Sequence, residues 1–572
     1  MTRVKSGLKK KLDVRGFFRN FDKNVDSTVD FVNKRLARTS LMALKFMLPS
    51  RISNPFEWSG VLTFVSFFVL AFTGGLLTLY YVPTFVASSS ASGGYYTAFD
   101  SVSRITWDIP FGYAMRSIHY WASNVMIIAA FIHLAYYYVR GRYKNPNEII
   151  WITGMTLGVL TVLEAYTGYD LIMNARAVQA INIGRKLLAS LQDYSPLLPA
   201  FNWLIEGQGI YDIVTRFYGF HLILVPFVML AGFLVHFPKN LKLDVSSIAF
   251  TLGTITVAAG LMPVDLGTKY LPAQPIQATV PEWYLSGLYA LLRTGGYLPH
   301  VFTGFVAGVA IPGVIITLFV LVPFLDRKLK RNWFDRTFWP NLLAGTMAAF
   351  LYITIMGYLL PSIPIRPDLF YGSIFLIGFA AFAVTYGLRN YYMTKAGIAP
   401  NPNDKPSLPE RFLANAHISS YKILFPLSIL SLFIAGGLTW VAYTVMINYG
   451  TTVGLISPSQ FTQDMHDAIL YGIPFAMLVP TGITAVSIWL GTRLNPRPKL
   501  PRTSYVLGEV TSTQIMSVMF VMGLALTALT VYSIIVGNQY SMLVEAGALL
   551  VVFGGAYHVY RLSMPVKSLL EE

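Results

Sequence analysis

Long apolar segments separated by short polar loops make up most of the chain. A helix needs about 20 residues to cross the hydrocarbon core of a bilayer, and twelve segments reach or approach that length. We expect membrane-spanning helices at 60–82, 112–139, 148–172, 214–237, 246–264, 302–325, 338–360, 369–389, 419–446, 467–493, 511–537 and 541–562. The pattern predicts an all-α fold, a polytopic transmembrane helical bundle of about 12 spans.

Basic residues are concentrated in alternate loops. The formal net charge is +16, and thirteen Lys and Arg precede Trp58, whereas the loop 447–466 has none. This positive-inside bias alternates correctly through all the spans and predicts an integral membrane protein with both termini cytoplasmic. Topology and attraction to anionic lipid therefore account for the charge, and nucleic acid is not expected as a partner.

Four of the eight histidines lie inside two predicted spans, where an ionisable residue is costly and points to function. His133 follows His119 by 14 positions, and His236 follows His221 by 15. Each pair therefore lies within about 60° of one helix face and about 21 Å apart along the axis. Two such helices side by side would form two stacked bis-imidazole sites, as in a pair of electron-transfer haems. Both spans run inward, so His119 and His221 form the outer pair, and His133 and His236 form the inner pair.

Glycines on the two neighbouring spans repeat the spacing of the histidines. Gly60 and Gly74 are 14 positions apart, and so are Gly154 and Gly168. Glycine lets a flat macrocycle lie against a helix backbone, where a side chain would collide. By direction of travel, Gly60 and Gly154 belong to the inner level, and Gly74 and Gly168 belong to the outer level.

Two further features bear on a haem site. Arg116 lies one helical turn before His119, toward the outer surface, where its guanidinium could neutralise a propionate or simply extend to the interface. The chain has no Cys. This excludes disulfides, thiolate-bound iron–sulfur clusters and covalent attachment of haem through this chain.

Four segments resemble the cytochrome b family of bc-type and photosynthetic complexes. They are W-x-I-P-F-G-Y-A-M-R-S-I-H-Y-W-A-S-N (107–124), W-I-T-G…A-Y-T-G-Y (151–169), T-R-F-Y-G-F-H (215–221) and P-E-W-Y…L-L-R-T (281–294). With this resemblance, the chain divides into an amphipathic cytoplasmic arm (1–57), a four-helix dihaem core (58–245), a C-terminal cytochrome b part (246–390), a cytoplasmic linker (391–416) and a four-helix extension (417–572). Such an extension is similar to long archaeal-type chains.

The resemblance implies two haems and a quinol-oxidation pocket on the outer side, with quinol as substrate and a Rieske iron–sulfur protein as partner. The haems are expected to be b-type, although the axial imidazoles would serve a-type haems equally well. Glu282 of P-E-W-Y would accept a proton from quinol, as suits a partly desolvated carboxyl; its alternative role is a helix cap. The remaining implied pocket residues are Pro281 and Trp283, which would shape the loop 265–301, and Tyr284 and Tyr169, which would line the pocket.

The chain departs from the family pattern in three places. Where the family has Pro-Trp after Gly168 and Tyr169, this chain continues with Asp170-Leu171-Ile172-Met173-Asn174. Where the family has an Arg three residues beyond the inner ligand, this chain has Tyr136, which leaves Arg140 and Arg142 as candidates near the inner propionates. The candidates for an inner quinone site are Lys239, Lys242 and Asp244, which positive-inside charge explains as well.

Two alternatives to a quinol-oxidising cytochrome b stay open. The first is a haem electron conduit in a terminal oxidase assembly, with oxidase subunits as partners and no quinol cycle of its own. The second is a secondary transporter with twelve spans, for which the histidine and glycine periods would have no explanation.

Overall fold

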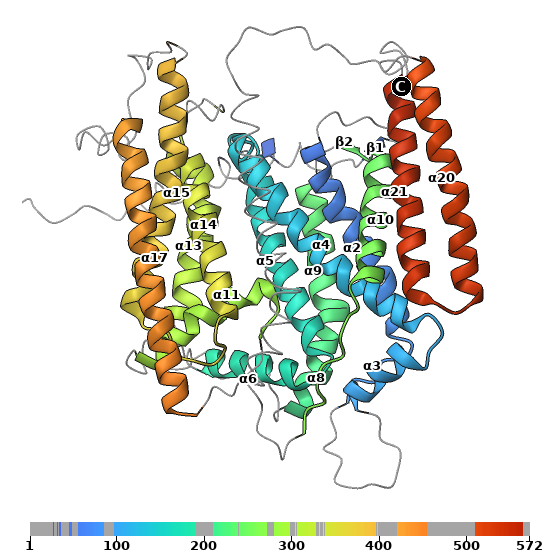
Figure 1. Ribbon diagram of the computed structural model, residues 1–572, viewed down its shortest axis with the longest axis horizontal. Helices are drawn as coiled ribbons and strands as arrows, with labels where there is room; N and C mark the ends of the chain where they lie inside the picture. The colour runs from blue at the N-terminus through green and yellow to red at the C-terminus, as the bar shows by residue number, and fades with distance from the viewer. Residues whose placement is uncertain are drawn as a thin grey trace, which may run out of the picture.

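The computed structural model gives a bundle of long, roughly antiparallel helices (Figure 1). The residues that it describes are 27, 31, 34–35, 45–47, 55–84, 97–189, 210–237, 240–271, 280–297, 304, 306–327, 331, 336, 338–395, 397, 420–454 and 509–563.

Ten helical segments within these residues are long and apolar enough to cross a membrane. Helix α10 (Val245–Leu261) is apolar but shorter. Eleven of the twelve predicted spans thus fall on described helices, and the span at 467–493 lies outside the described residues. The long helices are α2 (Trp58–Leu77), α4 (Gly112–Val139), α5 (Glu148–Asp170), α8 with η3 and α9 (Ile210–Gly219, Phe220–Leu224 and Val225–His236), η5 with α13 (Val306–Ala310 and Ile311–Leu325), α14 (Phe338–Tyr358), α15 (Pro367–Lys395), α17 (Tyr421–Thr452), α20 (Glu509–Ile535) and α21 (Gln539–Ser563).

Three shorter helices lie in connections that the apolar pattern left as loops. They are α3 (Ala98–Trp107), α6 (Ala175–Ala189) and α11 (Trp283–Arg293). Helices α3 and α6 lie at one end of the bundle, and the short parallel strands β1 (Lys45–Met47) and β2 (Asn240–Lys242) pair at the other end (Figure 1). A capping box starts α3, because Thr97 and Asp100 each bond the other's backbone N–H.

The helices that carry the histidines pack beside those that carry the paired glycines. Helix α4 packs on α2, and α9 packs on α5. Helices α11, α14 and α15 form a second packed group, which α13 joins to α5. Many large apolar side chains of α13, α17 and α20 remain exposed, as expected for helices that face lipid.

The described helices of the C-terminal extension lie in two separate places rather than in one four-helix unit. Helix α17 packs on α15, whereas α21 packs on α10 and α20 packs on α21, at the opposite side of the bundle (Figure 1). Small residues allow the α10–α21 contact: a methyl group at Gly253 would collide with the carbonyl oxygen of Gly547, and one at Gly260 would collide with that of Tyr540.

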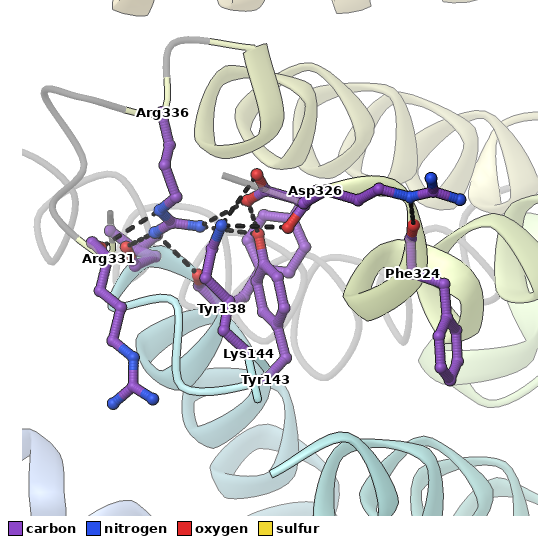
Figure 2. Close-up of polar contacts among 9 residues, drawn as sticks. Tyr138, Tyr143, Lys144, Phe324, Asp326, Arg331 and Arg336 are labelled. Carbon is purple, nitrogen blue, oxygen red and sulfur yellow. Dashed lines mark hydrogen bonds and ion pairs between the residues drawn. The ribbon is translucent and has the colours of Figure 1, made fainter. Parts of the chain in front are cut away.

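A buried ion cluster joins the α4–α5 connection to the segment between α13 and α14 (Figure 2). Asp326 accepts a hydrogen bond from the Tyr143 hydroxyl at 2.6 Å and pairs with Lys144 at 2.9 Å and Arg336 at 3.4 Å. The three charged side chains are at most 6% exposed. Removing Asp326 would leave two buried cations without a carboxylate, so the cluster fixes these two connections together.

The guanidinium of Arg293 helps to hold helix α11 against the end of α14. Arg293 donates to the carbonyl oxygens of Met356, Leu360 and Ile363 over 2.7–3.0 Å. The Met356 carbonyl lies in the last turn of α14, where backbone carbonyls lack partners within the helix and a cation can donate to them. Arg293 thereby anchors the C-terminal end of α11, the helix whose N-cap residue is Glu282.

Candidate functional site

The structure brings the four intramembrane histidines together in the two predicted pairs. The ring centroids are 6.3 Å apart for His119 and His221, and 6.1 Å apart for His133 and His236. An ion between two imidazoles would hold the centroids roughly 6 Å apart, because metal–nitrogen bonds are about 2 Å long. The spacing in both pairs therefore fits an iron with two axial imidazoles.

A π-helical turn, η3, explains why one histidine pair is spaced by 15 residues and the other by 14. His221 lies in η3 (Phe220–Leu224), where hydrogen bonds close over five residues. This wider turn takes up one extra residue without rotating the rest of the helix. His221 and His236 can therefore face α4 at the same two levels as His119 and His133.

Each paired glycine lies directly against a histidine of its own level. A methyl group at Gly60 would lie 3.0 Å from Cε1 of His133, and one at Gly74 would lie 3.1 Å from Cε1 of His119. Gly154 meets His236 and Gly168 meets His221 in the same way. The sequence predicts glycines that make room for a macrocycle; in the structure these glycines also make room for the imidazole rings.

The Nδ1 atom of every paired histidine faces a hydrogen-bond acceptor. Thr73 and Ser59 already donate their hydroxyl protons to backbone carbonyls, so their oxygens can accept from the ring. With Nδ1 protonated in this way, Nε2 carries the lone pair that a metal needs. The Nδ1 contacts are His119 to Thr73 Oγ1 at 2.9 Å, His133 to Ser59 Oγ at 3.4 Å, His221 to the Glu164 carbonyl at 3.0 Å and His236 to the Ile150 carbonyl at 2.9 Å.

A largely apolar cavity of about 330 Å³ contains the outer pair. His119, His221, Gly74 and Gly168 all line it. Arg116 lines it too, but its guanidinium donates to the backbone carbonyls of Val264 and Asp265 at 3.1 and 2.6 Å. Arg116, which is predicted to bind a propionate, thus also holds the loop that follows α10 in place through these hydrogen bonds.

A second cavity, of about 80 Å³, adjoins the first and contains the predicted proton acceptor. Glu282, Tyr169 and Tyr120 line both cavities. Of the other predicted pocket residues, Pro281 and Trp283 line the smaller cavity and Tyr284 lines the larger one.

Glu282 occupies the N-cap position of α11, yet its side chain makes no capping hydrogen bond. Instead, Oε2 accepts a hydrogen bond from the Tyr120 hydroxyl at 3.2 Å. Burial raises the pKa of Glu282, while the charge of Arg176 and the Tyr120 hydrogen bond oppose that rise. The carboxyl therefore points into the cavity and is a stronger base than a carboxyl in water.

The neighbours of Glu282 are fixed by hydrogen bonds to other helices. The indole N–H of Trp283 donates to Asn124 Oδ1 at 2.7 Å, and the Tyr284 hydroxyl donates to the Ala165 carbonyl at 3.2 Å. Helices α4 and α5 thereby set the position of the whole P-E-W-Y turn. The Tyr169 hydroxyl is buried and has no hydrogen-bond partner within the described part of the chain.

Two of the five polar candidates on the inner side, Arg140 and Asp244, make contacts within the chain. Arg140 pairs with Glu57 at 3.3 Å, and the Tyr136 hydroxyl donates to the same carboxylate at 3.2 Å. The side chain of Asp244 caps α10 by accepting from the backbone N–H groups of Ser246 and Ser247. Asp244 therefore has a structural role, and Lys239 lies outside the described residues.

Three polar residues of the two cavities, which contact or face Glu282 or His221, were not identified from the sequence. Tyr120 and Arg176 face Glu282, and Glu164 contacts His221. A signal was available for Glu164, because it is an acidic residue in the middle of an apolar span. Arg176 lies just beyond α5, where the chain departs from the family pattern, so no motif marks it.

Comparisons with known proteins agree with the motifs. A family model described as cytochrome b (N-terminal)/b6/petB matches residues 124–242, and one described as cytochrome b (C-terminal)/b6/petD matches residues 272–379. Cytochrome b6 of Heliobacterium mobile is 35% identical over 193 residues, which are 33% of this chain and 84% of the relative. Cytochrome b of Sulfolobus acidocaldarius is 26% identical over 378 residues, 56% of this chain and 64% of the relative. A solved structure titled "Hyperthermophilic respiratory Complex III" aligns with a TM-score of 0.44 and 21% identity, over 73% of this chain and 100% of that chain.

Proposed function

Because the chain belongs to the cytochrome b family, we propose that it is the dihaem, quinol-oxidising subunit of a respiratory membrane complex. It oxidises quinol on the outer side of a prokaryotic plasma membrane and moves electrons across the membrane between two bis-histidine haems. One observation carries the proposal: two imidazole pairs with centroids 6.3 and 6.1 Å apart, and the carboxyl of Glu282 in the cavity of the first pair.

The proposed cofactors are two b-type haems. His119 and His221 would hold the outer iron through Nε2, and His133 and His236 would hold the inner iron. With both axial positions filled, haem iron supplies one-electron transfer rather than oxygen chemistry. The Nδ1 acceptors support this assignment, because they fix each imidazole in the tautomer and orientation that ligation requires.

Glu282 is the proposed proton acceptor. Oxidation of a quinol to a quinone releases two protons and two electrons, so a base must lie beside the hydroxyl that loses its proton. The buried carboxylate of Glu282 takes one of these protons, and the Tyr120 hydroxyl stabilises the carboxylate before the transfer. The two electrons would leave separately, one to a Rieske iron–sulfur protein, which is the proposed partner, and the other to the haem that His119 and His221 would hold.

The orientation in the membrane follows from the loop charges. We place both termini, the arm 1–57 and the linker 391–416 on the cytoplasmic side, where Lys and Arg accumulate. Glu282 and the His119–His221 pair then lie on the outer side. The dihaem core is 58–245, and 246–390 supplies the proton acceptor.

The test is an absorption spectrum of the complex, isolated from native membranes with its partner subunits. We expect α-bands of low-spin b-type haem after dithionite reduction, and two haems per chain by pyridine haemochromogen assay. A haem-free preparation would refute the proposal and favour the transporter alternative.

A further inference from the structure

Glu164 is an acidic side chain inside the membrane that the quinol chemistry does not use. It lies in α5 about one turn before Gly168, and it is the only charged residue of that helix between Glu148 and Asp170. It lines the larger cavity together with His119 and His221. Ionisable groups at such depths are costly, so a local interaction must account for this one.

That interaction is with the ring nitrogen of His221 that faces away from the proposed iron. Oε1 of Glu164 lies 3.1 Å from Nδ1 of His221, the backbone carbonyl of Glu164 lies 3.0 Å from the same atom, and the Thr167 hydroxyl lies 3.3 Å from it. Oε2 is buried and has no hydrogen-bond partner within the described part of the chain. His221 is thus the polar partner of this carboxyl among the described residues.

The other three histidines have only neutral groups at Nδ1. These are the Thr73 hydroxyl for His119, the Ser59 hydroxyl for His133, and the Ile150 carbonyl and, at 3.5 Å, the Thr153 hydroxyl for His236. The carboxyl therefore breaks the near symmetry of the two sites, and it does so at the outer pair.

We propose that Glu164 is a positioning residue that lowers the midpoint potential of the outer haem through His221 and so favours electron flow inward. A carboxyl oxygen that shares the Nδ1 proton makes the imidazole a stronger electron donor, which stabilises ferric over ferrous iron. An outer haem that is harder to reduce than the inner one passes its electron inward with a favourable free energy. This inference rests on the proposed function, because it requires haem on His221.

The experiment is a redox titration of haem absorbance in the intact complex carrying Glu164→Leu or Glu164→Gln. We expect Glu164→Leu to raise the outer midpoint potential and leave the inner one unchanged. Glu164→Gln should cause a smaller rise, because its amide oxygen can still accept a hydrogen bond from Nδ1 of His221. A His133→Ala background, which should keep only the outer haem, assigns the two potentials.

Thr161→Val is the matched control. Thr161 lies on the same helix and lines the same cavity, but its hydroxyl donates to the Leu157 carbonyl at 2.8 Å. We expect both potentials to stay unchanged in this variant. If the Glu164→Leu complex loses the outer haem, the midpoint potentials of the Glu164→Gln complex test the inference.

Unchanged potentials in the Gln and Leu variants, or equal shifts at both haems, would overturn the inference. If these variants bind two haems and still oxidise quinol, such a result rejects the role of Glu164 alone. If the unaltered complex contains no haem, the proposed function itself has failed.

Discussion

The hydroxyl of Tyr120 donates a hydrogen bond to Oε2 of Glu282 over 3.2 Å. Tyr120 directly follows His119 in α4, whereas Glu282 begins the turn into α11. This contact joins the proposed proton acceptor to the helix of an outer ligand. Because Tyr120 lies in α4, a change in α4 can alter the pKa of Glu282.

Replacing Glu282 with Gln should reduce quinol oxidation by about 100-fold or more, because a proton acceptor contributes that much to such a step. In the unaltered complex, the rate should rise with pH as Glu282 loses its proton. Since burial raises its pKa, that rise lies at higher pH than for a carboxyl in water. The measurement is the steady-state rate against pH, with haem content as the control. An unchanged rate in the Gln variant would favour the electron-conduit alternative.

Tyr120→Phe should shift the rise of the quinol-oxidation rate to higher pH. The lost hydrogen bond stabilises the charged form of Glu282, so its removal raises the pKa of that carboxyl further. Tyr352→Phe serves as the control, because Tyr352 bonds Thr439 and lines neither cavity. Identical pH profiles for the Tyr120 variant and the unaltered complex would show that this hydrogen bond does not act on the base.

His133→Ala should remove the inner haem and largely spare the outer one. The two pairs are separate sites on the same helices, so loss of one ligand acts at one level. Haem stoichiometry and the spectrum of the reduced complex measure this. Loss of the outer haem alone would reverse the proposed topology.

Gly168→Val should weaken binding of the outer haem, because the added side chain would collide with the ring of His221. Gly158→Val on the same helix is the matched control, since no atom lies within 4 Å of a methyl group there. We expect the outer haem to be lost or reduced in occupancy only in the Gly168 variant. Equal haem content in both variants would count against the observed ring packing.

Asp326→Asn should destabilise the protein by about 3–5 kcal/mol, since it leaves Lys144 and Arg336 buried without their carboxylate. Asp368→Asn, in the exposed pair with Arg366, should change stability little. Thermal unfolding of the purified complex compares the two. A midpoint for Asp326→Asn equal to that of Asp368→Asn would contradict a stabilising role for the cluster.

The spans and the pairing of histidines could be predicted because both depend on local rules. Helix rise and periodicity place His119 and His133 on one face without any knowledge of the neighbours, and the ends of α4 agree with the predicted 112–139. The additional residue before His236 could be counted, but its accommodation in a π turn could not be predicted. That turn depends on packing of the whole helix.

The surroundings of Glu282 could not be predicted for a different reason. Tyr120 is 162 positions away in the chain, and no periodicity relates two residues that different helices bring together. The same holds for the ion pair of Lys144 with Asp326, which are 182 positions apart. Motifs identified which residues carry chemistry, whereas the tertiary fold determined which partners adjust that chemistry.

The contact of α10 with α21 has a consequence for biogenesis. The glycine face of α10, with Gly253 and Gly260, enters the bilayer long before the ribosome reaches Gln539–Ser563. Until α21 is inserted, α10 lacks the helix that covers this face in the structure. Insertion of α20 and α21 is therefore the step that completes this flank of the core, and translation arrested before it should yield an assembly intermediate.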